Sequence, residues 1–216
     1  MEPENTIRSF KKAEEIGVDA LELDVRATKD GEIVVFHDRD LKRLFDLNRS
    51  IENLTLAELK AISVSREIPT LDEVLASIKS DVNIEIKVHG IEAKVLEKIK
   101  NFPHKVLISS FYPGVLKKIR TLDGNVRLGL NFLRDELSFR ALLSYLTRNV
   151  HLSSIHIENK HANLTHILLL RLLSRRIYVW TVNTEADFRN MQKLGVDGVF
   201  TDHPELMKIY EQSSRL

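Results

Sequence analysis

The chain has 216 residues, of which 43% are hydrophobic, enough for the core of one large domain. Its formal net charge is +1 and its charges are spread along the chain, so we expect no surface for a polyanion such as a nucleic acid. It has no cysteine, which excludes disulfides, thiol catalysis and cysteine-ligated zinc. There is no transmembrane or signal-peptide pattern, and the lack of cysteine fits a reducing compartment, so a cytoplasmic protein is expected.

The first part of the chain predicts helices around a two-stranded hairpin. Gly17 ends an opening helix, and a turn signal at 28–31 joins two short apolar strands into a hairpin. In chain order, we expect a helix over 5–16, strands over 19–25 and 33–37, short helices within 40–66, and a helix over 70–80. The second hairpin strand and the short helices form an insertion over about 26–67.

From residue 82 onward, strands and amphipathic helices alternate in a regular order. We expect strands over 82–88, 106–111, 126–132, 153–157, 177–182 and 197–201, followed in turn by helices over 90–101, 113–121, 135–147, 163–174, 185–194 and 204–212. Such repeated units indicate a parallel sheet, and the lack of a linker or a change in composition indicates one domain over 1–216.

The strand count falls one short of the eight parallel strands of a (β/α)₈ barrel. With the strand over 19–25 included, the sequence predicts seven parallel strands and one hairpin strand. Every helix of the repeat follows a strand, so the absent strand is expected before the helix over 5–16. The expected fold is therefore α/β, a TIM-type barrel whose first strand is not among these residues.

Carboxylates lie on the polar faces of two strands that are otherwise apolar. Glu22 and Asp24 are two residues apart and point to one side of their strand, and Glu85 occupies the polar face of another. Buried carboxylates are costly unless a cation neutralises them, and oxygen ligands favour Mg²⁺, Ca²⁺ or Mn²⁺. Salt bridges on an exposed edge are the alternative, but catalytic groups of such barrels lie at the carboxyl ends of strands, which favours a metal site.

Two further side chains fit a hydrolytic site beside these carboxylates. His37 ends the hairpin strand, where it can act as a general acid or base near neutral pH, although a lone histidine there is more often structural. Lys87 shares a face with Glu85, where it either binds phosphate or forms a salt bridge. Arg43 follows shortly after the histidine, and a solvated surface arginine is its simpler interpretation.

Aromatic residues near the ends of two later strands have two interpretations. Trp180 is the only tryptophan, and Phe111 ends the strand that begins at 106. Each is either a core residue or part of a platform for a small organic group at the barrel mouth. Four histidines recur at intervals of five, a spacing that fits neither a helix face nor a strand face, and we interpret them as incidental: His151, His156, His161 and His166.

Seven segments occur in the order typical of one enzyme family. They are PENT at 3–6, GVDALELD at 17–24, TKDG at 28–31 with VVFHD at 34–38, IPTLDEVL at 68–75, NIEIK at 83–87, WTVN at 180–183, and GVDG at 195–198 with TDHP at 201–204. In these segments the chain resembles the glycerophosphodiester phosphodiesterase family over nearly its whole length.

This resemblance implies a TIM barrel that hydrolyses small-molecule glycerophosphodiesters to sn-glycerol 3-phosphate and an alcohol with Mg²⁺ or Ca²⁺. By position, it implies that the metal ligands are Glu22, Asp24 and Glu85. It also implies that His37 is a catalytic histidine that protonates the leaving alkoxide, that Lys87 binds phosphate and that Trp180 lines the glycerol pocket. The metal would offset phosphoryl charge while the acid protonates the departing oxygen.

The family's first strand normally ends in His-Arg-Gly, which carries a second catalytic histidine and a phosphate-binding arginine. Nothing before Pro3 matches it. Three interpretations stay open: a phosphodiesterase whose given sequence lacks this strand, a short form that binds metal and ligand with little turnover or takes the strand from a partner, and an active enzyme that uses His37 alone. Without the strand, a closed barrel would leave two unpaired edges, which predicts poor solubility, a homo-oligomer or a gap in the barrel wall.

Overall fold

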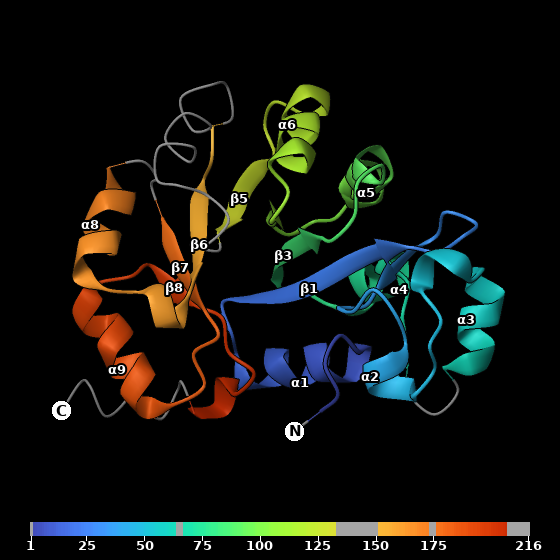
Figure 1. The fold of residues 1–216 in the computed structure, drawn as a ribbon, viewed down its shortest axis with the longest axis horizontal. Coiled ribbons are helices and arrows are strands. Elements are labelled where there is room, and N and C mark those ends of the chain that lie inside the picture. Colours follow the sequence, from blue (N-terminus) through green and yellow to red (C-terminus); the bar gives the residue numbers. More distant parts are fainter. Residues whose placement is uncertain (1, 64–66, 133–150, 173–175, 207–216) are drawn as a thin grey trace. The chain divides into compact units, whose positions relative to one another are not determined.

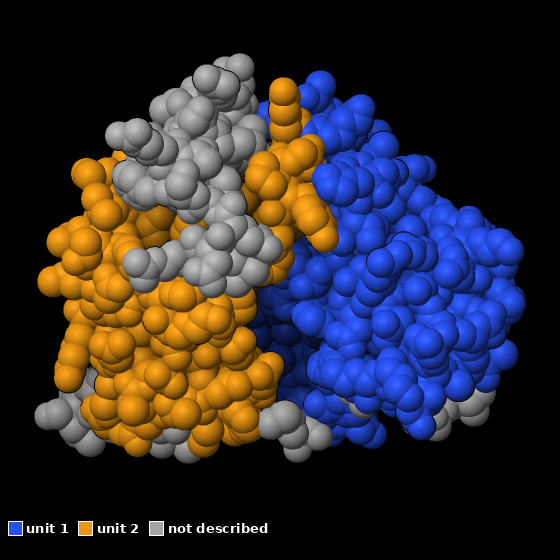
Figure 2. Space-filling model, viewed as in Figure 1, with its two compact units in different colours: residues 1–108, 118–126 blue, residues 109–117, 127–216 orange. Residues whose placement is uncertain are grey.

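The computed structural model describes residues 2–63, 67–132, 151–172 and 176–206. They belong to two compact units, coloured separately in Figure 2. Unit 1 comprises Met1–Ile108 with Lys118–Val126, and unit 2 comprises Ser109–Lys117 with Arg127–Leu216.

Unit 1 begins with a helix and a hairpin, and its strands lie in the order β2-β1-β3-β4. Its elements are α1 (Ile7–Ile16), β1 (Ala20–Ala27), β2 (Ile33–Val35), α2 (Lys42–Phe45), the 3₁₀ helix η1 (Ile51–Asn53), α3 (Leu56–Ile62), α4 (Leu71–Ser77), β3 (Asp81–Ile86) and α5 (Glu92–Ile99); all except β2 and η1 are labelled in Figure 1. The chain passes between the units within β4 (Val106–Ser110) and α6 (Pro113–Leu122). Strand β1 pairs antiparallel with β2 and parallel with β3.

Local capping fixes where three helices of unit 1 begin. The side chains of Thr6, Thr55 and Thr70 each accept a hydrogen bond from the backbone N–H three residues later, at the starts of α1, α3 and α4. Gly17 has a φ of 83° and ends α1, because glycine adopts this left-handed conformation without strain. The end of α1 therefore fixes the residue at which β1 begins, and this determines the face of β1 on which Glu22 and Asp24 lie.

The insertion between β1 and α4 has a hydrophobic cluster of its own. Its buried members come from β2, the loop after β2, η1, α3 and their flanks: Val34, Phe36, Leu41, Ile51, Leu54, Leu59 and Ile68. Leu44 and Phe45 of α2 pack against this cluster. Phe36 and Leu41 of this cluster anchor the backbone on both sides of His37. The backbone of His37 is therefore held in place, although its side chain is half-exposed.

Unit 2 is built from parallel strands in the order β5-β6-β7-β8. Its elements are β5 (Arg127–Phe132), β6 (Ser154–Glu158), the 3₁₀ helix η2 (Asn159–His161), α8 (Leu164–Arg171), β7 (Ile177–Trp180), α9 (Glu185–Leu194) and β8 (Gly198–Val199). The register aligns Asn131, His156 and Tyr178 in one row across three strands. Alternate residues such as Leu130, Ile155 and Val179 are fully buried.

The expected elements are found where the described residues cover them, with ends that differ by a few residues in either direction. The strand expected over 33–37 is only β2, so His37 lies in the loop after it. The helix expected over 135–147 and the end of the one expected over 204–212 lie outside the described residues. The absence of a strand before α1 stays a prediction. In the described part of the chain, no helix is both long and apolar enough to cross a membrane.

Candidate active site

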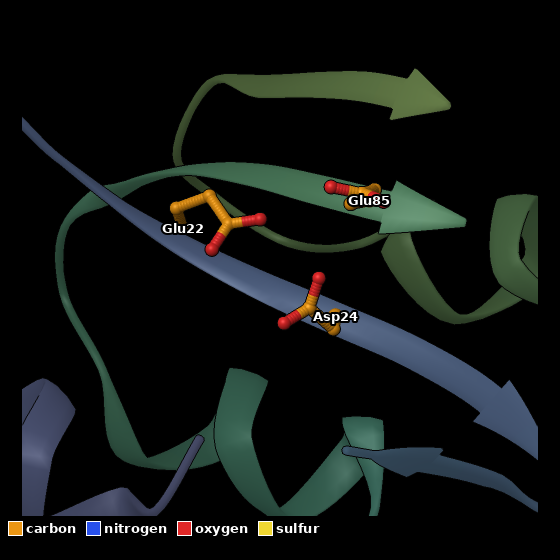
Figure 3. A group of neighbouring side chains, drawn as sticks. All are labelled: Glu22, Asp24 and Glu85. Carbon is orange, nitrogen blue, oxygen red and sulfur yellow. The ribbon is translucent and has the colours of Figure 1, made fainter. Parts of the chain in front are cut away.

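The three carboxylates expected from the sequence meet between β1 and β3. The parallel register sets Asp24 directly beside Glu85, and Glu22 lies one step earlier on the same face of β1. One carboxylate oxygen from each of these residues lies within 4.8 Å of the others, and Figure 3 shows the side chains directed toward a common space. Asp24 is 4% exposed and Glu85 is 7% exposed. Such a set of oxygen ligands can bind a divalent metal.

Lys87 also enters this cluster, from the residue just past the end of β3. Its Nζ lies 3.0 Å from Asp24 Oδ1 and 2.5 Å from Glu85 Oε1. Burial acts to lower the pKa of Lys87, but the charges of Asp24 and Glu85 outweigh burial and raise this pKa above its ordinary value. Lys87 is therefore an ammonium at neutral pH, and such a group can bind an anion.

The charge of this cluster favours a further cation. Burial raises the pKa of the Glu85 carboxyl; Lys87 and, more weakly, His37 oppose this, whereas the Asp24 carboxylate adds to it. Glu85 Oε1 is fully buried and makes no well-oriented hydrogen bond despite its short contact with Lys87 Nζ, so that contact is an ion pair. One ammonium cannot neutralise three carboxylates, and a divalent ion with oxygen ligands fits the remaining charge.

Asn5, for which no sequence pattern predicted a role, holds one of these carboxylates in place. Its Nδ2 donates to Asp24 Oδ2 at 2.9 Å, and the backbone N–H of Asp24 donates to Asn5 Oδ1 at 3.1 Å. The backbone of Asn5 has a φ of 56°, a conformation that asparagine tolerates better than most residues. The residue just before the α1 cap thus fixes the orientation of the Asp24 side chain.

His37 belongs to the same unit and is held by charged neighbours. Its Nδ1 lies 2.7 Å from Asp38 Oδ1, and Arg26 Nε donates to its backbone carbonyl at 3.0 Å. Arg43 Nε donates to Asp38 Oδ2 at 2.5 Å, and both terminal nitrogens of Arg43 donate to the carboxylate of Glu4. Arg43 is thus half-exposed but bound to two carboxylates, rather than the solvated arginine that the sequence suggested.

The aromatic residues expected at a platform contact each other within unit 2. The rings of Phe111 and Trp180 are perpendicular, with centroids 5.7 Å apart. Trp180 Nε1 is buried and has no hydrogen-bond partner among the residues that the structure describes. The two rings form one aromatic surface with an unused donor.

The regularly spaced histidines lie in different elements. His156 is buried in β6, where burial lowers its pKa to about 3 and its Nε2 lies 2.8 Å from Ser154 Oγ. His161 belongs to η2 and His166 to the first turn of α8. Their spacing in the sequence therefore does not bring them to one face.

Comparison with known proteins identifies the family. The family model for the "Glycerophosphoryl diester phosphodiesterase family" matches residues 2–206. The chain belongs to the glycerophosphoryl diester phosphodiesterase family. A glycerophosphodiester phosphodiesterase of Caldanaerobacter subterraneus is 33% identical and aligns over 95% of this chain and 90% of its own length.

Solved structures of glycerophosphodiester phosphodiesterases share the fold. The enzyme from Thermotoga maritima is 32% identical with a TM-score of 0.84, covering 95% of this chain and 91% of that one. A phosphodiesterase from Oleispira antarctica, solved in complex with the product sn-glycerol-3-phosphate, is 26% identical with a TM-score of 0.85, covering 97% and 92%. The predicted α/β, TIM-type barrel fold and the family resemblance are therefore confirmed.

Proposed function

We propose that this chain is a metal-dependent phosphodiesterase that hydrolyses glycerophosphodiesters to sn-glycerol 3-phosphate and an alcohol. The observation that carries this proposal is the nearly buried cluster of three carboxylates around Lys87 in a member of this family. Such a cluster provides ligands for a divalent cation and a cation for phosphate at one place.

The proposed binding roles follow from side-chain chemistry. Glu22, Asp24 and Glu85 would hold Mg²⁺ or Ca²⁺, whose charge would offset that of the phosphoryl oxygens and lower the pKa of a bound hydroxyl. Lys87 would bind a phosphate oxygen, because its raised pKa keeps it charged over the whole physiological pH range. Lys87 contacts the carboxylates of Asp24 and Glu85. On binding phosphate it would lose part of these ion pairs and form a new one with a phosphate oxygen.

His37 is the proposed proton donor to the leaving alkoxide. Its Nδ1 is engaged by Asp38, which leaves Nε2 as the nitrogen available for proton transfer. When it carries a proton, it acts to lower the pKa of Glu85, which puts it within electrostatic reach of the cluster.

We propose that Trp180 and Phe111 contact the glycerol part of the substrate. Their perpendicular rings offer an apolar surface for the carbon skeleton of the glycerol. The complex of the Oleispira antarctica relative with sn-glycerol-3-phosphate supports a glycerol phosphate product. We also propose that residues 1–216 form one functional domain, because the family match extends over residues from both units.

The alternative is a family member that binds metal and a phosphate ligand without efficient turnover. The carboxylates and Lys87 would serve such binding without any acid–base group. Loss of one acid–base group would lower the rate by roughly 10²–10⁴-fold.

One assay separates the two functions. The purified chain is incubated with glycerophosphocholine, glycerophosphoethanolamine or glycerophosphoglycerol, in Mg²⁺, Ca²⁺ or chelator, and release of glycerol 3-phosphate is measured. Metal-dependent release that is lost in Glu85→Gln supports the phosphodiesterase. Metal and glycerol 3-phosphate binding by calorimetry without any release would support the binding protein.

A further inference from the structure

Four side chains form a continuous series of contacts that begins at His37. In order they are His37, Asp38, Arg43 and Glu4, and they come from the loop after β2, from α2 and from the segment before α1. Glu4 and Arg43 are 39 residues apart in the sequence. All four belong to unit 1.

Each contact in this series restricts the next side chain. One carboxylate oxygen of Asp38 is hydrogen-bonded to Nδ1 of His37, and the other accepts a hydrogen bond from Nε of Arg43. Burial acts to raise the pKa of Asp38, but its hydrogen bonds with Arg43 and His37 outweigh burial and lower that pKa. An ionised carboxylate only accepts hydrogen bonds, so His37 carries a proton on Nδ1. In the neutral ring, Nε2 is then the unprotonated nitrogen, and this is the atom that takes up and donates the proton.

Arg43 uses the whole of its guanidinium in this arrangement. Nε binds Asp38 while the two terminal nitrogens bind the two oxygens of Glu4. A lysine ammonium could not make this planar, forked contact. We propose that Arg43, held by Glu4, is a positioning residue that fixes Asp38 and thereby the orientation and tautomer of the His37 ring. This inference rests on the proposed function for its catalytic meaning.

A purely structural surface ion pair is the competing explanation. Isolated exposed pairs contribute only about 0–1 kcal/mol to stability, and Arg43 and Glu4 are both about half-exposed. Here, however, the pair continues into Asp38, whose side chain is 20% exposed, and ends on the proposed catalytic histidine. The same pre-α1 segment also supplies Asn5, which binds Asp24 in two ways. Glu4 therefore acts on the side of the proposed proton donor, and Asn5 acts on a proposed metal ligand.

The leaving group distinguishes positioning of an acid from a contribution to folding. An alkyl alcohol leaves poorly unless it is protonated, whereas p-nitrophenolate leaves without an acid. The substrates are glycerophosphocholine and glycerophospho-p-nitrophenol, and the variants are Arg43→Gln, Arg43→Lys, Glu4→Gln and His37→Ala. Lys42→Gln is the matched control, because Lys42 is the neighbouring cation of α2 and pairs with Asp46 instead.

We expect His37→Ala to lower kcat on glycerophosphocholine by roughly 10²–10⁴-fold, and much less on the nitrophenyl substrate. Arg43→Gln should lower kcat on glycerophosphocholine by roughly 10–100-fold with KM nearly unchanged, because a displaced acid costs rate rather than binding. Arg43→Lys should recover only part of this loss, and Lys42→Gln should match the unaltered protein on both substrates. Glu4→Gln should add little in the Arg43→Gln background if it acts through Arg43. Equal losses on both substrates for Arg43→Gln would overturn the inference.

A second measurement needs no turnover. Nitrogen-15 NMR of the His37 ring should report a proton fixed on Nδ1 in the unaltered protein and in Lys42→Gln, and a mixture of tautomers in Arg43→Gln. A His37 spectrum that does not change in Arg43→Gln would show the inference to be wrong, whatever the assay gives. If the spectrum changes as expected but no variant, nor the unaltered protein, hydrolyses either substrate, the positioning stands and the proposed function fails.

Discussion

Asp24 and Glu85 are direct neighbours on paired strands, and both are nearly buried. Like charges in that position repel, and desolvation adds to the cost. Lys87 contacts both carboxylates and relieves part of the repulsion. The residual negative charge makes the affinity of this site for a cation a property of the folded state, because the unfolded chain does not bring these groups together.

Metal binding should therefore stabilise the protein against heat. At 100 times the dissociation constant, a ligand of the folded state adds about 2.7 kcal/mol. For a chain of this size we expect Mg²⁺ or Ca²⁺ to raise Tm by roughly 5–10 °C. In Glu85→Gln this increase should largely disappear, as measured by calorimetry with and without chelator.

Glu97→Gln is the control for this thermal shift, since Glu97 is an exposed carboxylate on α5. Its metal-induced change in Tm should equal that of the unaltered protein. An equal change in Glu85→Gln would place the metal elsewhere.

At the scale of strands and helices, the alternation of β1 made its half of the cluster predictable. Glu22 and Asp24 had to share a face because the strand repeats every two residues. The pairing of that face with Glu85 followed from the parallel order of β1 and β3. The contact of Arg43 with Glu4 could not be predicted in this way, because it depends on how the insertion packs rather than on any period within one element.

The close approach of β5 and β6 gives a second test at this scale. A Cβ on Gly129 would lie 2.7 Å from the ring of His156, which is buried and packs against Tyr178 and Phe200. We expect Gly129→Ala to lower the free energy of unfolding by about 1–3 kcal/mol, as overpacking usually does.

Gly124→Ala provides the comparison in urea unfolding. A Cβ at Gly124 would meet nothing within 4 Å. Its effect should stay within about 0.5 kcal/mol. Equal stabilities of the two alanine variants would mean that the strands do not approach as described.

At the scale of the whole molecule, His156 links stability to pH. Its pKa of about 3 in the folded protein lies below the ordinary value of 6.5 because the ring is buried. Between these values the unfolded chain binds a proton that the folded chain does not, so stability is present above about pH 6.5 and is lost as the pH falls toward 3. At pH 5 this loss should be about 2 kcal/mol.

Urea unfolding at several pH values tests this link. In His156→Asn the fall in unfolding free energy between pH 7 and pH 5 should be smaller by about 2 kcal/mol. His151→Asn, at an exposed histidine, should retain the fall seen in the unaltered protein. Retention of the full fall in His156→Asn would assign the acid sensitivity to other groups.

The order of elements in the described residues could be predicted because capping threonines, Gly17 and the regular alternation each act locally. The contact between Phe111 and Trp180 could not, since it joins residues that are distant in sequence. The burial of His156 could not be predicted either. The histidines that recur every five residues lie in a strand, a 3₁₀ helix and an α-helix, so their spacing matches no single element.

The hydrophobic cluster of the insertion and the β1–β3 pairing hold different parts of the proposed site. Leu44 and Phe45 follow Arg43 in α2 and pack against this cluster, whereas Asp24 and Glu85 depend on the β1–β3 pairing. Segments with their own buried contacts open as units below the global unfolding free energy. Opening of the insertion would release the proton donor and leave the cation ligands in place. Turnover and cation affinity can therefore drift apart during evolution, through substitutions that change only the opening free energy of the insertion.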